Sequence, residues 1–83
     1  MNTGKIVQVM GPVVDVTFDG ALPKIKDALS VNVNGNKRIM EVAQHVGPNT
    51  VRCIMLAESE GLARGMEVIG YDPYPTIKGK VSV

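Results

Sequence analysis

The 83 residues carry a formal net charge of +1, and 45% of them are hydrophobic, 20% charged and 4% aromatic. The near-neutral charge excludes nonspecific attraction to nucleic acid or membrane surfaces, which needs clustered basic residues. A single cysteine excludes an internal disulfide framework, and no apolar run approaches the ~20 residues of a membrane-spanning helix. The first residues lack the apolar core of a signal peptide, so we expect one small soluble domain in the cytoplasm.

Two predicted strands rich in Val and Ile open the chain, at residues 5–10 and 13–18. Branching at Cβ restricts χ1 and suits a pleated sheet surface. Between these strands, Gly11 and Pro12 predict a bend of the kind with which a small barrel turns a corner.

The second predicted strand has two distinct faces. Val14, Val16 and Phe18 alternate on one face, which we expect to line the core. Asp15 interrupts the valines on the other face. A lone carboxylate there can serve a site, but it is more often a solvent-facing or loop-bonding residue of a half-buried strand, and this is our expectation for Asp15.

Three further strands are predicted at residues 29–33, 37–44 and 50–56, each bounded by turn residues. Asn34 and Gly35 supply two positions that tolerate positive φ. The first two of these strands should therefore form a hairpin with a two-residue turn.

The rest of the chain completes an all-β pattern. Residues 66–69 predict a sixth strand, and a weaker alternation at residues 76–83 predicts a seventh. Residues 21–28 should form a covering loop or at most one helical turn. Short strands at regular spacing, with turn residues between them, are typical of a sandwich or a barrel.

A faint internal repeat relates the two halves of the sequence. Residues 8–12 resemble residues 44–48, which lie 36 positions further on and also end in Gly-Pro. An acidic-Gly turn, a leucine and a basic residue follow in both halves. This pattern predicts two similar halves related by a pseudo-twofold, and chance is the competing explanation because Gly-Pro turns are common.

Candidate catalytic residues are few. A phosphate-binding loop needs Gly-x-x-x-x-Gly-Lys followed by Ser or Thr, whereas Gly79-Lys80 is followed by Val81. Pairing His45 as a base with Cys53 as a nucleophile would require hydrogen-bond reach and a third orienting group. We favour the simpler interpretation, in which His45 sits half exposed at a strand end and Cys53 packs as a small hydrophobe.

Binding sites for metals or nucleic acid are also poorly supported. With one histidine and one cysteine, only a carboxylate metal site is conceivable, and residues 58–60 lack the ligand count of a calcium loop. A single-strand nucleic-acid binder would need stacking aromatics in a basic groove, and Phe18, Tyr71 and Tyr74 are few and scattered. We therefore expect no catalytic residue, no cofactor, no metal and no nucleic-acid partner.

Collinear blocks of the sequence resemble the beta subunit of F-type ATP synthase. They cover roughly the first five-sixths of the chain, in order and at the family's spacing, which is more specific than one short motif. The main blocks are residues 4–18, 22–25, 40–47, 49–55 and 60–68.

The resemblance implies an N-terminal β-barrel that is closed and usually has six strands, or seven if residues 76–83 add one. In this family the barrel joins those of the neighbouring alpha and beta subunits in a crown that holds the hexamer together, and it carries no catalytic residue. We therefore expect a non-enzymatic, structural protein whose partners are alpha and beta subunits. Its location would be cytoplasmic and peripheral to the membrane, without membrane insertion, and the isolated barrel could self-associate through exposed contact surfaces.

Residues 70–83 depart from the family's pattern. We expect residues 1–83 to form a single barrel domain, of which residues 1–69 carry the resemblance and residues 70–83 are a divergent or engineered closing segment. The family's nucleotide-binding domain has no counterpart in the sequence, so this chain would be an isolated or engineered fragment without ATP hydrolysis. The alternatives are a designed barrel without biological activity and an OB-like barrel that binds single-stranded nucleic acid.

Overall fold

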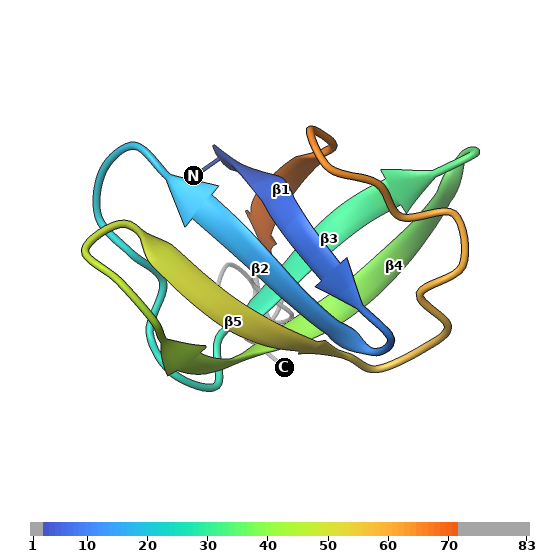
Figure 1. Ribbon diagram of the computed structural model, residues 1–83. Coiled ribbons are helices and arrows are strands. Elements are labelled where there is room, and N and C mark those ends of the chain that lie inside the picture. Colours follow the sequence, from blue (N-terminus) through green and yellow to red (C-terminus); the bar gives the residue numbers. More distant parts are fainter. Residues whose placement is uncertain (1–2, 72–83) are drawn as a thin grey trace, which may run out of the picture.

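The computed structural model describes residues 3–71, which form one closed antiparallel β-barrel (Figure 1). The strands are connected around the barrel in the order β1-β2-β5-β4-β3-β6. Their bounds are β1 Thr3–Met10, β2 Val13–Phe18, β3 Ala28–Val33, β4 Asn36–His45, β5 Thr50–Met55 and β6 Glu67–Tyr71. The all-β, closed six-stranded barrel is thus confirmed.

The sixth strand closes the barrel. β6 pairs with β1 through residues 67–69 and with β3 through residues 68–71, so both sides of the sheet meet on this one strand. The closing role that we expected for residues 76–83 therefore belongs to β6. The predicted seventh strand itself lies outside the described residues.

Two hairpin turns set the register of neighbouring strands. Asn34 and Gly35 have φ values of 53° and 85°, as the predicted two-residue turn requires. Gly11 has a φ of 59°, and Met10 pairs directly with Val13. The Gly11-Pro12 pair therefore reverses the chain in a second tight hairpin, where the sequence had predicted only a bend, because glycine permits positive φ at the first turn position.

The interior is filled by side chains from all six strands, most of them aliphatic. Val14, Val16 and Phe18 face inward as predicted, and each is at most 2% exposed. The core consists of Ile6, Val14, Val16, Phe18, Leu29, Val31, Val33, Met40, Val42, Val51, Cys53, Met55 and Val68.

The two halves of the chain, β1 to β3 and β4 to β6, take equivalent places in the barrel, because the β1–β2 pairing matches β4–β5 and the β1–β6 pairing matches β3–β4. β1 shifts register between Ile6 and Gln8, and β4 shifts register between Val42 and Gln44, 36 positions later. A bulge adds a residue and sharpens the local twist of the strand. Both bulges therefore bend the barrel at equivalent places, which bears out the repeat.

The backbone bonds beside these bulges repeat as well. Ile6 donates to the carbonyl of Met66 at 2.9 Å and accepts from the N–H of Gly65 at 2.7 Å. Val42 makes the same two bonds, at 2.9 and 2.7 Å, with residues 26–27. The halves are thus related by a pseudo-twofold in strand order, bulge position and loop attachment.

Side-chain volume is distributed differently in the two halves. Gly4 pairs with Phe18 in the first half, and the equivalent pair in the second half is Met40 with Met55. A Cβ on Gly4 would lie 2.6 Å from the carbonyl oxygen of Thr17, so no side chain fits there. One small and one large residue fill the space that two medium residues fill in the other half.

We predict that Val16→Asp unfolds the domain, because Val16 is 0% exposed and the new carboxylate would have no partner. Burying an unpaired charge costs on the order of several kcal/mol, comparable to the total stability of a small domain. Asn32→Asp, at an exposed position of β3, is the matched control. Circular dichroism during heating measures both, and an unchanged midpoint for Val16→Asp would show that the strand faces are assigned wrongly.

Candidate functional site

Cys53 and His45 are not arranged as a nucleophile and its base. Cys53 faces the core from β5 and is 0% exposed, as the sequence predicted. Burial, aided by the negative charge of Asp15, raises the pKa of the Cys53 thiol to about 12, so the thiol stays protonated at neutral pH. At the end of β4, the Nε2 atom of His45 donates to the carbonyl oxygen of Pro23 at 2.7 Å. Each residue is therefore engaged in packing or in holding a loop.

Asp15 is buried, at 5% exposure, and our expectation of a solvent-facing carboxylate is wrong. Arg52 lies directly opposite it, on β5. The guanidinium donates through Nε to Oδ1 at 2.9 Å and through Nη2 to Oδ2 at 3.1 Å. These hydrogen bonds, together with the carboxylate charge, raise the pKa of Arg52. The two-pronged contact satisfies the carboxylate without solvent.

The sequence carried one signal for this ion pair. Asp15 and Arg52 each occupy the third position of a strand that is otherwise mostly apolar. The pseudo-twofold places them at equivalent positions, facing each other across the β2–β5 contact. To predict this ion pair, one must know that β2 lies beside β5, although the two strands are distant in sequence. The alternation of residues within each strand does not give that information.

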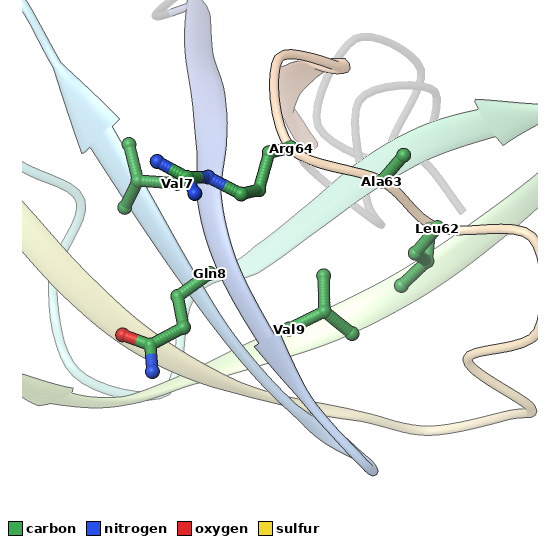
Figure 2. Close-up of a pocket in the computed structure, with 6 residues that line it drawn as sticks. All are labelled: Val7, Gln8, Val9, Leu62, Ala63 and Arg64. Atoms are coloured by element: carbon green, nitrogen blue, oxygen red, sulfur yellow. The ribbon is translucent and has the colours of Figure 1, made fainter.

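A groove of about 460 Å³ lies beside β1 (Figure 2). Sequence analysis did not find it, because the groove forms between a strand and a loop that are far apart in the chain. Its lining residues are Val7, Gln8 and Val9 of β1 and Leu62, Ala63 and Arg64 of the loop before β6.

The groove forms where β1 extends beyond its pairing with β6. β6 pairs with β1 only along residues 3–5 of β1. Ile6 is the last residue of β1 with a backbone hydrogen bond to the loop before β6. No backbone hydrogen bond within residues 3–71 joins Val9 to residues 62–64. In the other half, His45 occupies the position equivalent to Val9, and its bond to Pro23 ties strand and loop together. Val9 has no such bond to its loop within residues 3–71, which leaves the groove beside β1 open.

The lining of the groove combines polar and apolar groups. Val9 and Leu62 pack against the core and leave part of their surface in the groove. Arg64 is the one charged side chain among the six lining residues. Across residues 3–71, no group of three or more His, Cys, Asp or Glu side chains is placed to hold a metal ion.

The comparison with known families agrees with the barrel. Residues 6–71 match the ATP synthase alpha/beta family, beta-barrel domain. The chain belongs to this family. The matched span ends on the last residue of β6, so it covers the barrel through its closing strand. The resemblance drawn from the sequence is confirmed, and the matched domain is a non-catalytic unit of the family.

None of the described residues forms a helix long and apolar enough to cross a membrane.

Loss of one partner of the Asp15–Arg52 pair should destabilise the barrel. Arg52→Leu leaves the Asp15 carboxylate buried without its cation, and we expect the thermal midpoint to fall by roughly 5–10 °C. Asp15→Leu combined with Arg52→Leu removes both charges and should recover most of that loss. Thermal unfolding of the two variants and the wild type tests this, and equal midpoints for both variants would contradict it.

The buried thiol should make stability depend on pH in the alkaline range. The pKa of the Cys53 thiol rises from 9.0 in the unfolded chain to about 12 in the folded chain. The free energy of unfolding should be unaffected below pH 9 and fall as the pH rises towards 12, because the unfolded state alone ionises there. The loss at pH 10 should be about 1 kcal/mol.

Urea unfolding at pH 8 and pH 10 measures this effect, with Cys53→Ala as the control in which other titrating groups contribute equally. The wild type should lose more stability than the control between the two pH values. Identical losses in both proteins would show that Cys53 titrates alike in the folded and unfolded states.

Proposed function

We propose that this barrel is a structural unit that helps to hold the alpha/beta ring of ATP synthase together and performs no catalysis itself. The observation that carries this proposal is the family match over residues 6–71, together with the closed barrel that those residues form. The partners are the alpha and beta subunits of the ring. Residues 1–83 act as a single barrel domain, and the barrel is peripheral to the membrane as part of the complex.

The packing of the barrel supports a role as a rigid docking block. Each of the six strands is paired on both sides, and closure removes the free edges that would otherwise associate at random. Contacts with other subunits then come from side chains on the outer surface. Seven large apolar residues are exposed among those described: Val7, Met10, Ile25, Val46, Ile54, Leu56 and Ile69.

The chemistry of the polar side chains also supports a structural role. The Cys53 thiol is buried and protonated, and the Asp15 carboxylate is fully engaged by Arg52. The His45 ring is bonded to a backbone carbonyl. These three groups take part in interactions within the barrel. Contacts with neighbouring subunits would therefore come from other side chains, on the outer surface.

Binding to purified alpha subunits of ATP synthase tests the proposed function. We expect the chain to co-elute with alpha subunits in size-exclusion chromatography and to compete with full-length beta subunits during ring assembly. The unfolded Val16→Asp variant should do neither. No ATP hydrolysis should accompany the chain alone. Failure to bind alpha or beta subunits, or salt-dependent binding to a fluorescent single-stranded oligonucleotide instead, would overturn the structural role.

A further inference from the structure

The Asp15–Arg52 ion pair lies on the pseudo-twofold axis of the barrel. Asp15 stands opposite Gln8 across the β1–β2 contact, and Arg52 stands opposite Gln44 across the β4–β5 contact. Gln8 and Gln44 are equivalent positions of the two halves, so Asp15 and Arg52 are equivalent as well. These two residues also stand opposite each other on β2 and β5, which lie side by side in Figure 1. The pseudo-twofold therefore exchanges one for the other.

The opposite side of the barrel has the same arrangement without a charge. Ser30 of β3 stands opposite Ile69 of β6. Their other partners are Ile39 for Ser30 and Thr3 for Ile69, which are equivalent positions of the two halves. Ser30 and Ile69 are therefore the second pair on the axis. Between residues 28–31 and 68–71 no paired residue is charged, and between residues 13–17 and 50–54 the ion pair is the one charged pair.

A pair on the axis decides which halves can join. Suppose that the first half of one chain paired in the same scheme with the first half of a second chain. Val14 would then stand opposite Val16, and Leu29 opposite Val31, so the core positions of both contacts would stay apolar. On the axis, however, Asp15 would stand opposite a second Asp15. The aspartate is thus the residue that makes two first halves incompatible.

The burial of the ion pair makes this incompatibility costly. The Asp15 side chain is 7% exposed, and its two oxygens are satisfied by the guanidinium of Arg52. Two carboxylates facing each other at such a place have no cation between them, and like charges cannot both stay ionised there. In a pair of second halves, Arg52 would face a second Arg52. Its side chain is 38% exposed, so solvent weakens that repulsion, and the aspartate contributes most of the discrimination.

We propose that the Asp15–Arg52 pair determines which halves of the barrel join, and that it prevents like halves of two chains from pairing. Two chains can pair in this way while they fold side by side, before β2 has found β5. Opposite charges on the axis accept the other half and repel a second copy of the same half. Stability alone does not require an ion pair here, because apolar residues in place of a buried pair are often as stable. The inference is independent of the role proposed for the barrel in the ring.

Joint refolding of the full chain with a charge-exchanged variant tests the proposal. The variant carries Asp15→Arg with Arg52→Asp, so each protein alone still places opposite charges on the axis. In a mixture, like halves of the two proteins also bring opposite charges together, whereas unlike halves bring like charges together. A dimer of one wild-type chain and one variant chain therefore reports the pairing of like halves alone. We expect this mixed dimer after both proteins are unfolded in urea, combined and refolded at high concentration.

Native mass spectrometry with isotopically labelled wild type identifies the mixed dimer. Its amount should exceed, at least about tenfold, the amount found when the two proteins are refolded separately and then mixed. Association through the outer surfaces would give equal amounts in both samples and would reverse on dilution. Circular dichroism checks that the variant folds. Equal amounts of mixed dimer in the two samples, or none in either, would overturn the proposal.

Removal of both charges gives a second test, which does not need the exchanged pair to fit between the strands. Asp15→Leu with Arg52→Leu leaves no charge on the axis, so like halves are no longer repelled. After refolding at high concentration, this variant should contain more dimer that survives dilution than the wild type does.

The matched control places the two leucines on another residue pair of the same contact. Thr17→Leu with Thr50→Leu keeps the ion pair, so it should refold with as little dimer as the wild type. A charge-free variant that stays as monomeric as the wild type would contradict the proposal. An equal excess of dimer in the threonine variant would assign the effect to the leucines and would reject the proposal too.

Discussion

The pairing of β2 with β5 is the contact on which the rest of the barrel depends. It joins two three-stranded sheets, β6-β1-β2 and β3-β4-β5, and the β3–β6 pairing joins them again on the opposite side of the barrel. Either sheet alone would expose an apolar face and two strand edges, which is not a stable state in water. The Asp15–Arg52 pair lies in the middle of the first contact, so a charged interaction fixes the register of a mostly apolar seam.

The strands could be predicted from the sequence because their signals are local. Alternating valines define the core face of β2, and Asn34-Gly35 defines a hairpin through the backbone angles that it permits. The burial of Asp15 and the groove beside β1 depend on which strands meet across long stretches of chain. Alternation says which side of a strand faces inward, but not which residue will stand opposite. The ion pair and the groove were missed for this one reason.

The pseudo-twofold gives each surface residue an internal comparison. Where both halves have the same backbone pairing, a difference in side chain shows how the two halves differ in packing or in surface. His45 closes a strand against its loop, whereas Val9 at the equivalent place leaves a groove. Leu56 stands where the other half has Asp19. Both differences lie outside the core that the two halves share.

The position of β6 has a consequence for how the protein is made. Translation delivers β6 after the other five strands, yet both β1 and β3 need it as their partner. A nascent chain that has not yet released residues 67–71 from the ribosome holds two unpaired strand edges and an incompletely covered core. Such a species is prone to aggregate, so a chaperone that shields the open edges would favour closure of the barrel.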